Sequence, residues 1–103
     1  MYIKHGLILL GCLLSIPVFA INTQGYTTIK ELKAWDRTVD VYFNDGQQHE
    51  CTDSTHKTRF VVDAEKDQQI GFLLTALTAE RPVQLAYTCN SDGYPRIIGV
   101  RLR

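Results

Sequence analysis

Four side chains of types that bind metals lie in one short stretch: His49, Cys51, Asp53 and His56. Imidazole and thiolate are good ligands for Zn²⁺ or Cu⁺, and in an extended strand His49 and Cys51 would point to the same side. A disulfide would remove the thiolate, and pairing is the better-supported role for a cysteine in an exported chain. The sequence therefore predicts no metal site and no cofactor, with a small metal-handling protein as a minor alternative.

No motif in this chain places a nucleophile beside a base. Ser54 lies two positions from His56, but a working pair needs a tertiary arrangement that proximity in sequence does not provide. The Asp and Glu residues are scattered over predicted polar faces and turns, so no catalytic carboxylate pair is indicated. We predict that the protein is not an enzyme.

Aromatic residues beside charged ones are the remaining candidates for ligand binding. Trp35 is followed by Asp36 at a predicted strand end, where an exposed indole beside hydrogen-bonding charges could stack on a sugar or another flat ligand. Tyr94 and Arg96 follow a predicted turn and could extend this surface. The alternatives are a Trp that caps the hydrophobic core and a Tyr94 segment that only starts the last strand. The candidate ligand-binding residues are Trp35, Asp36, Tyr94 and Arg96.

The first twenty residues have the pattern of a signal peptide. Lys4 supplies a positive charge, residues 6–14 are almost purely apolar, and residues 18–20 offer small side chains at the cleavage positions. The expected mature chain is one domain, 21–103, secreted or periplasmic and without a membrane span. A lipoprotein attached through Cys12 is the alternative; otherwise Cys12 leaves with the signal peptide.

Two cysteines, Cys51 and Cys89, remain in the mature chain. Two thiols in an exported chain most often pair, so a structural disulfide is predicted. A crosslink across about 37 residues would stabilise the fold by on the order of 4 kcal/mol in the loop-entropy account. Such a crosslink makes a small core plausible.

The charge of the mature chain is nearly balanced. Without Lys4, ten basic side chains face eleven acidic ones, which gives a net charge of about −1. Non-specific binding to nucleic acids is disfavoured, because it depends on an excess of positive charge.

Strands are predicted in the first half of the mature chain. Residues 26–35 are rich in β-forming residues, with a break in alternation that a bulge would explain. Residues 39–43 alternate cleanly, and the turn at 44–46 predicts a hairpin with 47–51 as its return arm. Residues 59–62 have the pattern of a short buried strand.

A helix of about 15 residues is predicted next, with Asp63 as its cap and an apolar face on every third or fourth residue. The residues of this face are Ile70, Leu73, Leu74 and Leu77. Residues 83–89 then alternate as a strand and 90–93 form a turn. The last strand alternates with Ile98, Val100 and Leu102 on one side.

These elements predict a mainly β fold with one helix, in the order β-β-β-α-β-β. That is the order of an OB-fold, a small barrel of five to six strands that closes most of its sheet edges. An open α+β sheet with one packed helix is the alternative.

The chain resembles the binding subunits of subtilase-type and pertussis-like AB toxins. The resemblance rests on the signal peptide, the small disulfide-bonded OB-like chain, the helical segment Ile70-Gly71-Phe72-Leu73-Leu74-Thr75-Ala76-Leu77 and the segment Arg81-Pro82-Val83-Gln84-Leu85. It implies a homopentamer that acts with a catalytic A subunit and binds cell-surface glycans. The short acidic-and-serine motif of that family has no clear match in residues 22–28, so no sugar-binding residue is carried over.

We therefore expect an exported, non-catalytic, carbohydrate-binding module that works as a ring. Many weak sugar contacts would become strong by repetition around such a ring. The alternative is a monomeric periplasmic or secreted accessory domain that binds or inhibits a protein partner.

Overall fold

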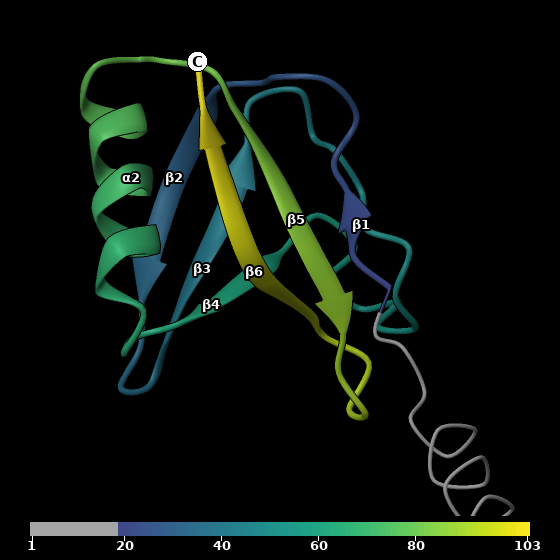
Figure 1. Ribbon diagram of the computed structural model, residues 1–103. Coiled ribbons are helices and arrows are strands. Elements are labelled where there is room, and N and C mark those ends of the chain that lie inside the picture. The colour runs from purple at the N-terminus through teal and green to yellow at the C-terminus, as the bar shows by residue number, and fades with distance from the viewer. Residues whose placement is uncertain (1–18) are drawn as a thin grey trace, which may run out of the picture.

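Six strands form one sheet in the computed structural model, which describes residues 19–103 (Figure 1). The strands are β1 (Ile21–Asn22), β2 (Ile29–Ala34), β3 (Thr38–Phe43), β4 (Phe60–Asp63), β5 (Val83–Cys89) and β6 (Pro95–Leu102). The helix α2 (Asp67–Thr78) connects β4 to β5. The predicted mainly β fold with one helix is thus confirmed over this range. The predicted signal peptide lies outside the described residues except for its last two, and so does the alternative attachment site Cys12.

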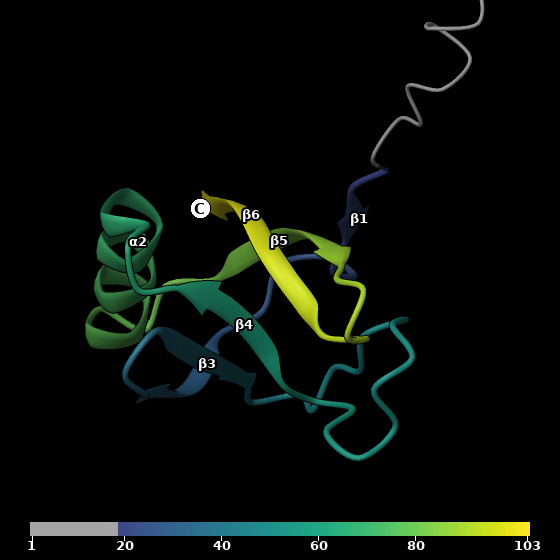
Figure 2. The ribbon, with the colours of Figure 1, turned by 90° about the horizontal axis from the view of Figure 1, so that it is seen from below.

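The strand order across the sheet is β1-β5-β6-β4-β3-β2. Neighbouring strands are antiparallel except β4 and β6, which run parallel and meet at Val61 and Arg96. Just before β2, the backbones of Thr27 and Val83 exchange two hydrogen bonds of 2.9 Å, which links this segment to β5. The sheet is curved, and α2 lies beside β2 and β6 (Figures 1 and 2).

The apolar core lies between the inner face of the sheet and α2. Its main side chains come from β3, β4, α2, β5 and β6: Val41, Phe43, Phe60, Val62, Leu73, Ala76, Val83, Leu85, Tyr87 and Ile97. The Phe60 ring lies edge-on to the rings of Phe43 and Tyr87, with centroids 5.5 and 5.2 Å away. Because side chains alternate along a strand, the outer face of β3, β4 and β6 carries the intervening, more polar residues.

The predicted hairpin after β3 is wrong. Residues 47–51 form part of a loop, and β3 pairs with β2 and β4 instead. The turn itself is present, since the amide of Gly46 donates to Phe43 O at 3.2 Å. The chain after it is held as a loop because the buried His49 donates its amide to Lys57 O at 3.0 Å. The bulge predicted in the preceding strand occurs as a register shift in β2, between Ile29 and Glu31.

The helix is shorter than predicted, with 12 residues. Asp63 does not cap it, because Asp63 ends β4 and its carboxylate Oδ1 accepts a hydrogen bond of 2.7 Å from Arg96. Leu73 is buried as predicted, but Leu74 is 50% exposed. In the described part of the chain, no helix is long and apolar enough to cross a membrane.

A bulge also changes the predicted orientation of the last strand. Ile98 is 48% exposed, whereas Ile97 is 2% exposed. Across the strand pair, Ala86 faces Gly99 and Tyr87 faces Ile97, so Ile98 is an extra residue without a partner. An extra residue shifts the alternation by one position, which turns Ile98 away from the core.

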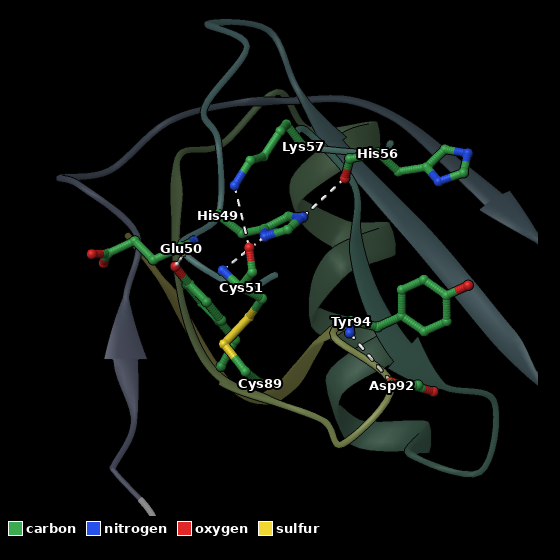
Figure 3. Close-up of a disulfide and its surroundings, with 9 residues drawn as sticks. His49, Glu50, Cys51, His56, Lys57, Cys89, Asp92 and Tyr94 are labelled. Atoms are coloured by element: carbon green, nitrogen blue, oxygen red, sulfur yellow. Dashed lines mark hydrogen bonds between the residues drawn. A yellow bond between two sulfur atoms is a disulfide. The ribbon is translucent and has the colours of Figure 1, made fainter. Parts of the chain in front are cut away.

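Cys51 and Cys89 form the predicted disulfide (Figure 3). It joins the loop before β4 to the end of β5. The crosslink therefore connects the two segments of the chain that lie on either side of α2.

Candidate functional site

Three of the four candidate residues line one pocket on the outer face of the sheet. Trp35 comes from the β2–β3 turn, Tyr94 from the β5–β6 turn and Arg96 from β6. The other lining residues are Thr38, Asp40, Arg59, Val61 and Asp92. The pocket has a volume of about 330 Å³, within the range of small-ligand sites.

Asp36, the fourth candidate, does not line this pocket. It borders a neighbouring hollow of about 540 Å³ together with Asp63. One residue of each lining joins the two hollows, since Asp63 is paired with Arg96 at 2.7 Å. The structure therefore brings together Trp35, Tyr94 and Arg96 but not Asp36.

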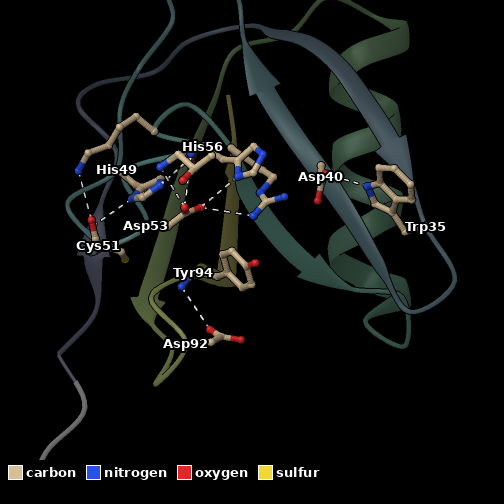
Figure 4. A network of polar contacts seen from close by, with 11 residues as sticks. Trp35, Asp40, His49, Cys51, Asp53, His56, Asp92 and Tyr94 are labelled. Atoms are coloured by element: carbon tan, nitrogen blue, oxygen red, sulfur yellow. Dashed lines mark hydrogen bonds and ion pairs between the residues drawn. The ribbon is translucent and has the colours of Figure 1, made fainter.

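Trp35 is held in a defined orientation at the mouth of the pocket. Trp35 is 56% exposed, so it is not the core cap that the sequence left as an alternative. The indole Nε1 donates a hydrogen bond of 2.8 Å to Asp40 Oδ2 (Figure 4), and Lys33 Nζ lies 4.8 Å from the ring centre. An exposed aromatic ring fixed in this way is suited to stacking on a ligand.

Tyr94 forms the opposite wall and rests on Arg59. The guanidinium carbon of Arg59 lies 4.6 Å from the Tyr94 ring centre, and Arg59 Nη2 donates to Asp53 Oδ2 at 3.3 Å. The backbone amide of Tyr94 donates to Asp92 Oδ1 at 3.2 Å (Figure 4). These contacts position the ring from two different loops.

The β5–β6 turn is packed closely against the loop that contains the disulfide. The amide of Asp53 donates to Gly93 O at 3.1 Å. Gly93 has a φ of +89°, and a Cβ there would lie 2.5 Å from Thr52 Oγ1. Because the Cys51–Cys89 disulfide crosslinks the same two segments (Figure 3), it braces the wall that carries Tyr94.

Burial, hydrogen bonds and charge together shift the pKa of Tyr42 on β3 and of Asp53, the partner of Arg59. Burial, and after it the charge of Asp40, raises the pKa of Tyr42, against the opposing effect of Arg59. For Asp53, burial alone would raise the pKa, but hydrogen bonds from the amides of His56 and Thr55 and the charge of Arg59 hold it below its usual value. The outer face is therefore a region of mixed charge with both donors and acceptors.

The metal ligands considered in the sequence do not assemble into a site. The sulfur of Cys51 is bonded to Cys89. His49 is only 3% exposed, and its Nδ1 accepts a hydrogen bond of 3.0 Å from the amide of Cys51. The proton therefore lies on Nε2, which donates to His56 O at 2.9 Å. Within residues 19–103, no group of three His, Cys, Asp or Glu side chains is placed to hold a metal ion.

Sequence reasoning missed Asp40 and Arg59 as members of the site. Asp40 has the pattern of a solvent-facing residue in an alternating strand, and Arg59 precedes a short apolar run. One signal was present, since Thr38, Asp40 and Tyr42 alternate with apolar residues and so lie on the outer face of β3. Their closeness to Tyr94 depends on the strand order, which a local pattern does not contain.

Comparisons with protein-family models, with curated proteins and with solved structures give no match for this chain. The interpretation of the pocket therefore depends on its own chemistry. It offers two aromatic rings, the carboxylates of Asp40 and Asp92, and the guanidinium groups of Arg59 and Arg96. Such a set can stack on a flat or ring-shaped ligand and form hydrogen bonds with its polar groups.

Proposed function

We propose that this protein is an exported, non-catalytic binding protein that holds a carbohydrate in the pocket between Trp35 and Tyr94. The observation that carries the proposal is that aromatic rings from two separate turns line one pocket with Asp40, Arg59 and Arg96. A sugar has apolar ring faces that suit aromatic side chains and hydroxyl groups that suit charged donors and acceptors.

An OB-fold-like barrel is the architecture we propose for this site. The parallel contact between β4 and β6 and the bridge between Thr27 and Val83 support a sheet that curves back on itself. OB-folds bind oligosaccharides on the face of their second and third strands and at the loops between strands 1 and 2 and between strands 4 and 5. With β2 counted as strand 1, the second and third strands are β3 and β4. The two loops are then the β2–β3 turn, which carries Trp35, and the β5–β6 turn, which carries Tyr94.

We further propose that the protein acts as a ring, in line with its resemblance to toxin binding subunits that form pentamers with a catalytic subunit. Phe72 and Leu74 are each 50% exposed on α2. Residues two positions apart in a helix lie about 200° apart around its axis, so these two side chains face different sides of α2. Gln69, one turn before Phe72, donates to Ile98 O at 3.0 Å, and Ile98 is itself exposed. Two different apolar sides on one subunit suit the head-to-tail contacts of a ring.

The disulfide supports an exported location for this protein. Disulfides persist in oxidising compartments and are rare in the cytosol. The Cys51–Cys89 crosslink thus favours a secreted or periplasmic protein.

Native mass spectrometry of the oxidised protein tests the ring. We expect a pentamer that Phe72→Glu dissociates and that Gln68→Glu leaves intact, since Gln68 is an exposed polar residue of the same helix. A monomeric wild-type protein would contradict the ring and favour the accessory domain that binds a protein partner.

A glycan array tests the binding site. We expect the wild-type protein to bind a subset of glycans and Trp35→Ala to lose that binding. Gln68→Ala, which changes an exposed helix residue outside the pocket lining, is the matched control and should bind the same subset. Unchanged binding by Trp35→Ala would place the site elsewhere.

A further inference from the structure

The carboxylate of Asp40 is the most unusual charged group of the pocket. Asp40 is only 3% exposed, yet none of the described cationic side chains forms an ion pair with it. Its Oδ2 accepts from the Trp35 indole at 2.8 Å, and its Oδ1 receives no hydrogen bond from residues 19–103. Oδ1 is not one of the fully buried side-chain atoms without a partner in residues 19–103, so it remains open to a donor. Because Asp40 lines the pocket, a bound ligand can supply that donor.

The two arginines of the pocket are already neutralised by carboxylates outside it. Arg59 is paired with Asp53 at 3.3 Å, and Arg96 with Asp63 at 2.7 Å. Each guanidinium has five N–H donors, so both retain donors beyond the one used in the ion pair. They can therefore donate to a ligand without presenting an uncompensated positive charge.

The balance of these groups disfavours anionic ligands. An anionic ligand would place its charge beside the carboxylate of Asp40, which has no cationic partner in residues 19–103, and the two charges would repel each other. A cationic ligand meets no comparable repulsion, because Arg59 and Arg96 are already paired with carboxylates. A neutral sugar suits both Asp40 and the two arginines, because each hydroxyl both donates and accepts.

We infer that the pocket selects a neutral over an acidic sugar residue and that Asp40 is its specificity-determining group. The inference rests on the proposed carbohydrate-binding function and names the chemical class of ligand. A hydroxyl of the sugar donates to Asp40 Oδ1, while neighbouring hydroxyls accept from Arg59 or Arg96 and the ring stacks on Trp35 or Tyr94. Repulsion from Asp40 excludes the acidic sugar of the same shape, which is how specificity often arises.

Sugars that share one ring but differ in charge provide the test. The probes are the methyl glycosides of galactose, glucose and mannose, each with its uronic acid and 2-amino counterpart. The chain has one tryptophan, so the indole N–H signal of ¹⁵N-labelled protein reports on the Trp35–Asp40 contact at the pocket. We expect at least one neutral glycoside to shift this signal, with an affinity about tenfold or more above that of its acidic counterpart. The amino counterpart, which Asp40 does not repel, should not be excluded in this way.

Substitution of Asp40 separates its role from that of the pocket as a whole. In Asp40→Asn the amide oxygen can still accept from Trp35, but the ligand meets an N–H₂ group in place of the acceptor. We expect neutral-sugar affinity to fall about tenfold and the preference for neutral over acidic sugar to shrink. Asp45→Asn is the matched control, because Asp45 is an exposed carboxylate that does not line the pocket, and the affinity of this variant should change less than about twofold.

The outcomes distinguish the inference from the function on which it rests. Equal or tighter binding of an acidic sugar by the wild-type protein would overturn the inference and leave carbohydrate binding intact. Unchanged selectivity in Asp40→Asn would remove Asp40 as the determinant. No response to any of the nine glycosides, with the indole signal of a folded protein in place, would contradict both proposals.

Discussion

The guanidinium group of Arg59 lies 4.6 Å from the centre of the Tyr94 ring. The same guanidinium donates to Asp53 at 3.3 Å, and the amide of Asp53 donates to Gly93 in the turn that carries Tyr94. The aromatic wall of the pocket is therefore connected to the disulfide-containing loop by a closed set of contacts. Changes in this loop should affect both the stability of the protein and the position of Tyr94.

Acid should weaken the fold in part through Asp53. Burial alone would raise its pKa, but the amide donors and Arg59 outweigh this and hold the folded-state pKa below the usual 3.8. The deprotonated carboxylate thus stabilises the folded state above this value, and the contribution is lost as the pH falls through the lower folded-state pKa. In Asp53→Asn this part of the acid sensitivity should vanish.

Urea unfolding at a series of pH values below neutrality measures the effect of Asp53. The stability difference between the wild-type protein and Asp53→Asn should shrink as the pH falls below the usual pKa of Asp. Asp92→Asn serves as the control carboxylate, and a difference that stays constant with pH would show that Asp53 is not coupled to folding.

Loss of the disulfide should cost a large part of the net stability. The Cys51→Ser, Cys89→Ser double variant removes a crosslink between residues 38 positions apart. The loop-entropy account predicts a decrease of roughly 4 kcal/mol in the free energy of unfolding, which denaturant unfolding without reductant measures. A loss below about 1 kcal/mol would mean that the unfolded chain is already compact in this region.

Gly93 should tolerate substitution much less well than Gly46, although both have positive φ. A Cβ at Gly93 would meet Thr52 Oγ1 at 2.5 Å, whereas a Cβ at Gly46 would meet nothing within 4 Å. We expect Gly46→Ala to lower the free energy of unfolding by about 1 kcal/mol and Gly93→Ala by about 2–4 kcal/mol. Denaturant unfolding compares the two, and adding Thr52→Ala should restore part of the Gly93→Ala loss. Equal losses for the two glycine variants would contradict the close packing of the turn.

His49 should matter for stability and His56 should not. The His49 ring accepts from the amide of Cys51 and donates to the carbonyl of His56, so His49→Ala leaves two backbone groups without partners. A decrease of about 2–4 kcal/mol in the free energy of unfolding is expected. His56→Ala is the control, since its side chain is 49% exposed, and it should change stability by less than about 0.5 kcal/mol. Similar effects of both substitutions on thermal unfolding would show that the His49 ring is not the anchor of this loop.

Local patterns predicted most of the elements because the alternation of apolar residues records which face of a strand is buried. The strand around Val41 follows directly from that alternation, and the helix around Leu73 from apolar residues at every third or fourth position. Ile98 was assigned to the wrong face because the bulge opposite Ala86 and Tyr87 arises from pairing between two strands, which neither strand's pattern contains.

The candidate site was predicted only in part, for a related reason. Trp35 and Tyr94 were identifiable because an aromatic residue at a turn has few structural roles. Asp40 was not identifiable, because a single sequence does not show that a polar strand residue will be covered by a neighbouring indole. The contact between Arg59 and Tyr94 likewise depends on the parallel pairing of β4 and β6, which brings together two segments that are far apart in the sequence.

The fluorescence of Trp35 offers the most direct test that the pocket binds a carbohydrate. It is the chain's only tryptophan, and its exposed ring lines the proposed site, so titration with the strongest glycan from the array reports on this place alone. We predict a saturable change in emission, with the same half-saturation as binding measured by calorimetry, and its loss in Tyr94→Ala. Calorimetric binding of that glycan without any change in Trp35 emission, and with full affinity in Tyr94→Ala, would contradict the account.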